Sequence, residues 1–461
     1  MATVDFGRYK RIVQMFWDPE PTNDVPLDQP VWCLGRSYTL ADEKAHHGPS
    51  GSPLNLPSSS PPLLSSFQGS DQPPPSSDAA AAAPATSSNP VPASQPLSID
   101  HPEPRSHGGW PAAFLDDFES KLWMTYRSDF EPIPKSTDPD SLSALSFQMR
   151  VKSQLVDQGG FSSDSGWGCM IRSGQSLLAN TISIQRMGRG WRRGQNSDEE
   201  KDIISMFADD GRAPYSIHNF VAHGAQFCGK YPGEWFGPSA TARCIRALVN
   251  EHESDLRVYS TGDGPDVYED EFMNIAQPDG ESFHPTLILV GTRLGIDKIT
   301  QVYWEALIAA LQLPQSVGIA GGRPASSHYF IGAQGSYLFY LDPHHTRPAL
   351  PYHSDPRLCT EDDVDSCHTR RLRRLHLNEV DPSMLIGFLI RNRDEWVEWR
   401  RSVRHVQGKP VISVTDRATV LSGEPNPGGL IDEVEALSDE EGEGGDGDDD
   451  DDDGVVVSRT I

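Results

Sequence analysis

The chain has 461 residues, with 39 Lys+Arg against 66 Asp+Glu, so its formal net charge is -27. Only 36% of its residues are hydrophobic, which is low for a fully folded chain. The acidic balance argues against nucleic acid as a main partner, because phosphate binding needs clustered Lys and Arg. No apolar run approaches the roughly 20 residues that span a bilayer, and the N-terminus lacks the apolar core of a secretory signal.

The cysteines indicate a reducing, intracellular compartment, because six in a chain of this length do not form a disulfide framework. Cys359, Cys367 and His368 do not have the spacing of a zinc site. Seven residues separate the two cysteines, and no second ligand pair follows. The sequence leaves open whether Cys359 or Cys367 takes part in redox regulation.

The first predicted element is a short strand within Pro30–Leu40, which lies in an N-terminal segment of residues 1–47. Residues 48–107 are predicted to be a disordered insertion. The stretch from 48 to 100 contains 14 Ser and 12 Pro and cannot bury enough apolar surface to fold. Since both flanks have ordered patterns, the insertion interrupts one folded domain.

The ordered domain is predicted to extend over residues 108–414. Its first helix is predicted over Phe114–Phe130, where apolar residues recur at helical spacing. Further helices are predicted at Cys169–Arg186, Ser239–Glu251, Thr300–Leu311 and Asp394–His405. Strands are predicted at Thr286–Val290, His328–Ile331 and Tyr337–Leu341, the last two joined by a turn that contains Gly335. This mixture without regular alternation predicts an α+β fold.

Residues 415–461 are predicted to be a disordered acidic tail. From Ile431 onward, fourteen Asp and Glu residues stand against the single basic residue Arg459, which is about half of the acidic excess of the chain. A run such as Asp448–Asp453 repels itself and does not pack.

The first candidate for chemistry is the segment DSGWGCMIRSGQ, residues 164–175. Gly166 and Gly168 permit a tight backbone before a helix, and Cys169 is placed in its first turn. There the unpaired backbone N–H groups and the helix dipole favour a thiolate, and they could bind an oxyanion. The alternative is a structural cysteine packed beside Trp167.

A thiolate nucleophile needs a histidine, and usually a carboxylate or amide that orients it. The segment LDPHHT supplies Asp342 and His344, two residues apart at a strand end, where both side chains can lie on one side. His328 begins the preceding strand and is a competing base. Geometry alone does not choose between His328 and His344, whereas alternation turns His345 away from Asp342.

The segment GIAGGRP, residues 318–324, has the glycines of a phosphate loop but lacks the G-K-[ST] ending. It also leads into a predicted strand and not into a helix. We therefore expect a flexible loop near the site.

Several long segments, taken together and in order, resemble the autophagy-related cysteine protease family that processes and delipidates the ubiquitin-like autophagy modifier. They are VWCLGRSY, LWMTYRSDF, GWGCMIRSGQSLL, YPGEWFGPS, GGRPASSHYFIG, YLDPHHTRPAL and DPSMLIGF. The resemblance covers about residues 30–45 and 107–405. It implies a papain-like cysteine protease fold with a small inserted finger-like subdomain.

The resemblance also implies the roles of individual residues. Cys169 is implied as the nucleophile, His344 as general base and acid, and Asp342 as the residue that orients His344. Tyr126 and the Cys169 backbone N–H are implied as the oxyanion hole. The implied gate over the site comprises Trp235 and the loop residues Gly321, Gly322, Arg323 and Pro324. No metal or organic cofactor is implied.

The implied substrate is the ubiquitin-like autophagy modifier, cleaved after its C-terminal glycine in both the precursor and the phosphatidylethanolamine-linked form. The implied location is the cytoplasm, with recruitment to the preautophagosomal structure or autophagic membranes, or the nucleus. An aromatic-x-x-aliphatic motif for docking the modifier by strand addition is absent from the acidic tail. Tyr9–Ile12 and Phe272–Ile275 fit that pattern elsewhere.

Two alternatives remain beside this interpretation. One is a papain-like protease for ubiquitin or another ubiquitin-like modifier. The other is a catalytically inactive scaffold that binds the modifier. The presence of Cys169, Asp342 and His344 together argues against the scaffold.

Overall fold

The computed structural model describes residues 19–24, 29–40, 108–155, 159–253, 255–323 and 326–417. The predicted insertion at 48–107 and the tail from residue 418 onward lie outside the described residues. Helices and strands alternate irregularly along the rest, and the predicted α+β class is confirmed.

A mixed sheet forms the centre of the molecule, and it is mainly antiparallel. Its strand order is β12 (Arg374–His376), β10 (Tyr337–Leu341), β9 (Ser326–Gln334), β8 (Ser316–Arg323), β13 (Ser383–Ile390), β7 (Thr286–Arg293) and β5 (Arg257–Ser260). A hairpin of β1 (Val31–Cys33) and β2 (Arg36–Tyr38) adds to β9 through β1. The N-terminal strand that the sequence predicted is therefore part of the same sheet as the rest of the domain.

The central strands are apolar on both faces. In β13, every residue is buried. Leu385 and Leu389 belong to the hydrophobic cluster on one face, whereas Ile386 and Phe388 belong to the cluster on the other. Side chains alternate between the faces of a strand, so an unbroken apolar run such as Thr286–Val290 indicates a sheet covered on both sides.

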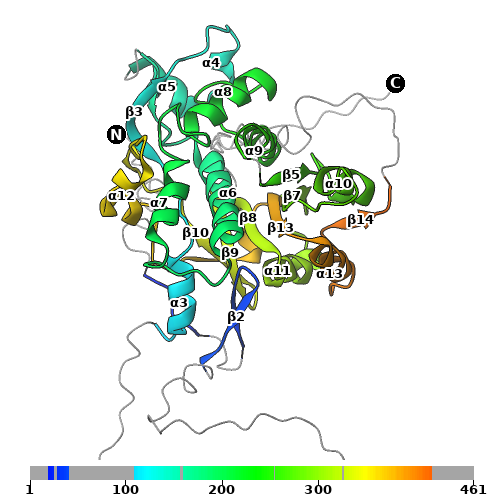
Figure 1. Cartoon of the computed structure of the whole chain (residues 1–461). Coiled ribbons are helices and arrows are strands. Elements are labelled where there is room, and N and C mark those ends of the chain that lie inside the picture. The colour runs from blue at the N-terminus through cyan, green and yellow to red at the C-terminus, as the bar shows by residue number, and fades with distance from the viewer. Residues whose placement is uncertain are drawn as a thin grey trace, which may run out of the picture.

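Helices cover both faces of this sheet (Figure 1). On one face lie α6 (Cys169–Met187), α8 (Ile217–Phe227) and α9 (Pro238–His252). On the other lie α10 (Glu269–Ala276), α11 (Trp304–Gln312) and α13 (Arg393–Arg404). The predicted helices at Cys169–Arg186, Ser239–Glu251, Thr300–Leu311 and Asp394–His405 are thus confirmed, with a 3-10 turn over Gln301–Tyr303 preceding α11.

Smaller elements surround the layers. A three-stranded sheet has the order β11 (Arg347–Pro348), β3 (Arg127–Ile133) and β4 (Phe161–Ser163), and a two-stranded sheet joins β14 (Ser413–Thr415) to β6 (Asp266–Tyr268). The remaining helices are α3 (Ala112–Glu119), α4 (Ser141–Ala144), α5 (Phe147–Leu155), α7 (Ser197–Ser205) and α12 (Glu361–Asp365). Single 3-10 turns cover Pro356–Leu358 and Leu377–Glu379.

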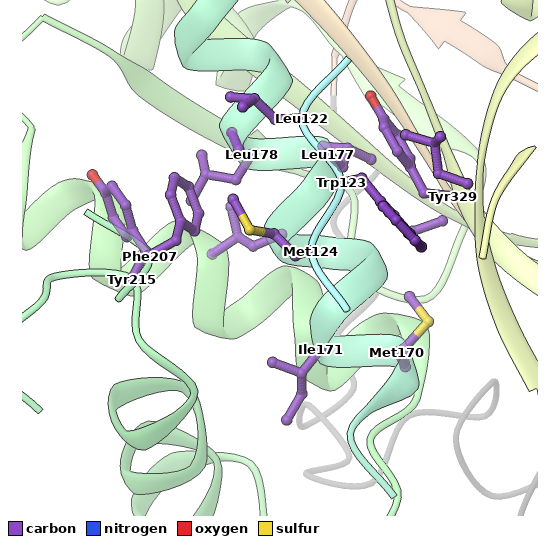
Figure 2. Packing of buried hydrophobic residues seen from close by; sticks show 14 of the residues in the cluster. Leu122, Trp123, Met124, Met170, Ile171, Leu177, Leu178, Phe207, Tyr215 and Tyr329 are labelled. Carbon is purple, nitrogen blue, oxygen red and sulfur yellow. The ribbon is translucent and has the colours of Figure 1, made fainter. Parts of the chain in front are cut away.

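The prediction of one helix over Phe114–Phe130 is wrong beyond Glu119, about a third of its length. Helix α3 ends at Glu119, and the chain then runs beside α6 to enter β3 at Arg127 (Figure 2). Side chains of α6 supply the hydrogen bonds that a helix would have made internally. Asn180 bonds both backbone groups of Leu122, at 3.0 and 2.8 Å, and Ser176 accepts from the Met124 N–H at 2.9 Å.

The glycine-rich segment at 318–324 is not a flexible loop through most of its length. Gly318–Arg323 belong to β8, which pairs with both β9 and β13. Glycine is required at Gly318, where φ is +97° and a Cβ would lie 2.5 Å from the Tyr329 ring. The glycines therefore serve close packing within the sheet.

Among the helices of the described residues, none is long and apolar enough to span a membrane.

Candidate active site

Cys169 is the first residue of α6, as the sequence predicted. Gly166, with φ of +94°, and Gly168 at the N-cap make the tight turn before the helix. Trp167 is buried and donates from its indole N–H to the Ser163 carbonyl at 3.0 Å. The turn presents the thiol at the helix N-terminus, where the helix dipole favours a negative charge.

Asp342 and His344 follow the end of β10. Oδ1 of Asp342 accepts a hydrogen bond from Nδ1 of His344 at 2.6 Å and another from the His344 backbone N–H at 3.0 Å. The loop is held from a distant part of the chain. Trp123 donates from its indole N–H to the Asp342 carbonyl, and the Tyr126 backbone N–H donates to the Pro343 carbonyl, both at 2.8 Å.

The electrostatics of Cys169 and His344 favour a thiolate–imidazolium pair. Burial raises the pKa of Cys169, but the neighbouring His344 side chain and its charge outweigh this and leave the pKa lowered. Burial lowers the pKa of His344, but Asp342 and Cys169 outweigh this and raise it. Burial also raises the pKa of Asp342, but the two histidines outweigh this, so that its pKa lies well below the usual range. The directions of these pKa shifts favour a thiolate beside a protonated imidazole in one buried site.

His328 lies next to this group without bonding to Asp342. Its Nε2 is 3.9 Å from Oδ1 of Asp342, and its ring centroid is 5.3 Å from that of His344. Burial lowers the pKa of His328 to about 3, so the imidazole is neutral. His345 packs its ring against Trp123, with centroids 5.8 Å apart. The geometry thus favours His344 over both other histidines as the partner of Asp342.

Tyr126 and Trp235 both reach the sulfur of Cys169. Burial and the neighbouring Cys169 raise the pKa of the Tyr126 hydroxyl well above its usual value, and the Tyr126 ring lies edge-on to His344 with centroids 5.3 Å apart. The Trp235 indole N–H contributes to lowering the pKa of Cys169, although it has no partner of ordinary hydrogen-bond geometry among the described residues. With these neighbours, Cys169 is only 2% exposed.

The other predicted gate residues lie at the end of the β8–β9 hairpin. Gly321 and Gly322 are paired with β9, and Arg323 is exposed and forms an ion pair with Glu379 at 2.9 Å. Pro324 lies outside the described residues. Ser326, on the returning strand, places its hydroxyl 3.3 Å from Nε2 of His344.

Ligand atoms of His328, Asp342 and His344 lie within 4.8 Å of one another, which is the one such group of His, Cys, Asp and Glu in the described residues. Here Oδ1 of Asp342 already accepts the Nδ1 proton of His344. Coordination by both atoms would require loss of that hydrogen bond. The arrangement therefore suits proton transfer better than metal binding.

The motif at Phe272–Ile275 is not a docking strand. It lies in helix α10, and Phe272 is buried, with its ring stacked on Trp396 at a centroid distance of 4.0 Å. Tyr9–Ile12 lies outside the described residues.

Sequence reasoning missed Trp123 and Ser326, which contact the Asp342–His344 loop. Neither has a local signal of function, because both are brought to the loop from other segments. For Trp123, the misleading signal was helical periodicity in a segment that belongs to no helix. All six cysteines lie in the described residues, where they are buried and form no disulfide, and this includes Cys359 and Cys367.

Comparison with known proteins agrees with this geometry. Residues 111–402 match the family model described as the peptidase C54 catalytic domain. The chain is 62% identical over 459 residues to "Cysteine protease ATG4" of Gibberella zeae, covering 96% of this chain and 98% of that protein. It is 57% identical to "Cysteine protease ATG4" of Pyricularia oryzae with the same coverage, and 58% identical to "Cysteine protease 1" of Neurospora crassa, covering 96% and 92%. The chain therefore belongs to the peptidase C54 family, the autophagy-related cysteine proteases with a papain-like fold.

Proposed function

We propose that this autophagy cysteine protease cleaves the ubiquitin-like autophagy modifier after its C-terminal glycine. It acts on the precursor, whose residues after the glycine it removes, and on the form linked to phosphatidylethanolamine, which it releases from the membrane. The observation that carries the proposal is the group of Cys169, His344 and Asp342 at the start of α6, in which His344 is hydrogen-bonded to Asp342 and lowers the pKa of Cys169.

In the first half of the reaction, the Cys169 thiolate attacks the glycine carbonyl carbon. The oxyanion that forms accepts hydrogen bonds from the Cys169 backbone N–H and the Tyr126 hydroxyl. The His344 imidazolium, held by Asp342, donates its Nε2 proton to the leaving nitrogen as the C–N bond breaks. A thioester and a free amine result.

In the second half, His344 is neutral and takes a proton from water, which attacks the thioester. Collapse of the second oxyanion expels the Cys169 thiolate and leaves the modifier with a free glycine carboxylate. Because only the leaving amine differs between the two substrates, one site serves both reactions.

Access to this site requires movement of its cover. Cys169 is 2% exposed, the Trp235 side chain contributes to lowering its pKa, and Ser326 at the end of the β8–β9 hairpin lies 3.3 Å from His344. We infer that the gate of Trp235 and residues 321–324 opens when the modifier binds, and that a narrow passage favours glycine, which has no Cβ. A covered thiolate is also protected from oxidation.

The protein acts in the cytoplasm under this proposal. Its substrate recruits it to the preautophagosomal structure or to autophagic membranes, and the nucleus is a further compartment. These statements rest on the family membership and on the chemistry of the substrate.

The test incubates the protein with modifier extended beyond its C-terminal glycine, and in parallel with modifier coupled to phosphatidylethanolamine in vesicles. We expect cleavage after the glycine in both, abolished by Cys169→Ala. A ubiquitin fusion extended in the same way is the matched substrate control. Cleavage of the ubiquitin fusion without cleavage of the extended modifier would favour the second candidate, a ubiquitin protease. Binding of the modifier without cleavage would favour the scaffold.

A further inference from the structure

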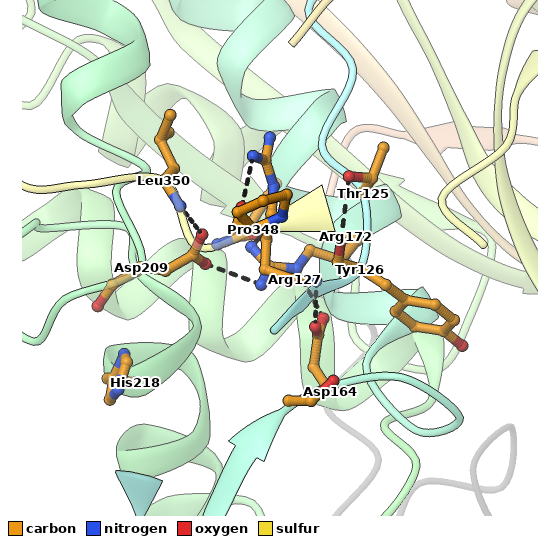
Figure 3. Close-up of polar contacts among 12 residues, drawn as sticks. Thr125, Tyr126, Arg127, Asp164, Arg172, Asp209, His218, Pro348 and Leu350 are labelled. Atoms are coloured by element: carbon orange, nitrogen blue, oxygen red, sulfur yellow. Dashed lines mark hydrogen bonds and ion pairs between the residues drawn. The ribbon is translucent and has the colours of Figure 1, made fainter. Parts of the chain in front are cut away.

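A cluster of buried charges connects the turn that precedes Cys169 with the backbone of Arg127 and Leu350 (Figure 3). It consists of Asp164, Arg172 and Asp209, whose side chains are at most 1% exposed. Arg172 donates from Nε to Oδ2 of Asp164 at 2.7 Å, and its Nη2 forms an ion pair with Oδ1 of Asp209 at 2.8 Å. Burying three charges is costly even when they are paired, so their presence here needs an explanation beyond stability.

Asp164 connects the backbone on both sides of the proposed oxyanion hole. Its carboxylate accepts from the Arg127 N–H at 2.6 Å, one residue after Tyr126. Its carbonyl accepts from the Gly168 N–H at 2.8 Å, one residue before Cys169. Gly168 packs so closely that a Cβ there would lie 2.5 Å from Oδ2 of Asp164. Asp164 thus links the backbone next to Tyr126 to the backbone at the start of α6.

Arg172 extends this connection to the chain that follows His344. Through Arg172, the cluster includes Asp209, whose Oδ2 accepts from the Leu350 N–H at 2.8 Å. The Asp209 N–H in turn donates to the Leu350 carbonyl at 2.9 Å. Just before Leu350, Arg347 donates from its backbone N–H to the Tyr126 carbonyl at 2.9 Å. The cluster therefore joins the segments that carry Cys169, Tyr126 and His344.

We propose that Asp164 and Arg172 are positioning residues that hold the Cys169 N–H and the Tyr126 hydroxyl at the separation needed to bind the oxyanion. This inference rests on the proposed function, since it concerns the same acyl transfer. Neither residue contacts the sulfur or the substrate. Their effect is expected in turnover, because donors to an oxyanion act in the transition state more than in substrate binding.

The test uses Asp164→Asn, which keeps the size of the side chain but cannot accept from both Arg127 and Arg172. Two rates are compared: turnover of the extended modifier, which forms an oxyanion, and alkylation of Cys169 by iodoacetamide, which forms none. We expect kcat to fall about 10²-fold, near the loss for one oxyanion donor. KM and the alkylation rate should stay within about twofold of wild type, because the thiolate–imidazolium pair is intact.

The matched control is Asp117→Asn, which breaks the buried Lys121–Asp117 ion pair of 2.7 Å, with side chains 7% and 1% exposed. It should lower the thermal midpoint of unfolding, but it should not lower kcat relative to the alkylation rate. Arg172→Lys is the second variant and answers the question if Asp164→Asn does not fold. Lysine keeps a cation between the two carboxylates but cannot bridge both. We expect kcat to fall about 10-fold while the alkylation rate stays near that of wild type.

The outcomes distinguish this inference from the proposed function. Equal losses of turnover and alkylation, or unchanged turnover in both variants, would overturn the positioning role. The same separation in Asp117→Asn would overturn it too, by showing that any buried pair has this effect. Wild-type protein that does not cleave the modifier would overturn the proposed function, and this inference with it.

Discussion

Replacing Asp342 by Asn removes the negative charge of this residue but keeps its hydrogen bonds to His344. Oδ1 of Asp342 accepts from both Nδ1 and the backbone N–H of His344, at 2.6 and 3.0 Å. The Asn Oδ1 can accept both bonds, so the imidazole stays oriented. What is lost is the negative charge that, with Cys169, raises the pKa of His344 to about 10 against the opposing effect of burial.

The size of the effect follows from that charge. A neighbouring opposite charge shifts a pKa by about 1–3 units, which corresponds to about 1.4–4 kcal/mol. The equilibrium constant for forming the thiolate–imidazolium pair should fall about 10- to 10³-fold, and kcat/KM at neutral pH should fall by no more than that factor. A histidine with a raised pKa keeps its proton until the pH passes that pKa. The alkaline limb of the pH profile should therefore move to lower pH in Asp342→Asn.

The assay is kcat/KM for the extended modifier between pH 5 and 11, with the thermal midpoint measured for each variant. Asp342→Ala is the matched comparison, because it removes the charge and also the oxygen that accepts both hydrogen bonds from His344. The Ala variant should therefore be less active than Asp342→Asn. An Asn variant with wild-type activity and an unmoved alkaline limb would refute the electrostatic role of Asp342. Equal activity of the Ala and Asn variants would refute the orienting role.

Three further predictions test other parts of the structure. His344→Ala should abolish cleavage, whereas His328→Asn should retain more than a tenth of it, and the reverse order in turnover measurements would reassign the base. Trp235→Ala should change the cleavage rate of the modifier and leave the circular dichroism spectrum intact; an unchanged rate would exclude it from the gate. Leu385→Ala, fully buried in β13, should cost about 2–5 kcal/mol in urea unfolding, against less than about 0.5 kcal/mol for the exposed Val397→Ala. Similar losses in both would contradict the assignment of the core.

Local chemistry in the sequence was sufficient to predict the two halves of the candidate site. Glycines before an amphipathic segment predicted a cysteine at a helix start, and α6 begins at Cys169. Alternation and a turn at Gly335 predicted the β9–β10 hairpin, with Asp342 and His344 just beyond its end. These features depend on neighbours within a few residues, which is the range over which capping and strand alternation act.

The rest was decided by contacts between distant segments. Residues 120–126 continue the helical periodicity but belong to no helix, because Asn180 and Ser176 of α6 bond the backbone of Leu122 and Met124. Gly318–Arg323 have the composition of a loop but form a buried strand between β9 and β13.

The sequence by itself determined the fold class, the helix that begins at Cys169, and the candidate partners Asp342, His344 and His328, since each of these is encoded by residues close together in the chain. Only the tertiary structure brought Cys169 against His344 and placed Asp342 2.6 Å from His344 but 3.9 Å from His328. It also connected Asp164, Arg172 and Asp209. The physical reason is that side-chain distances across a packed core depend on the whole arrangement of sheet and helices, which no local pattern encodes.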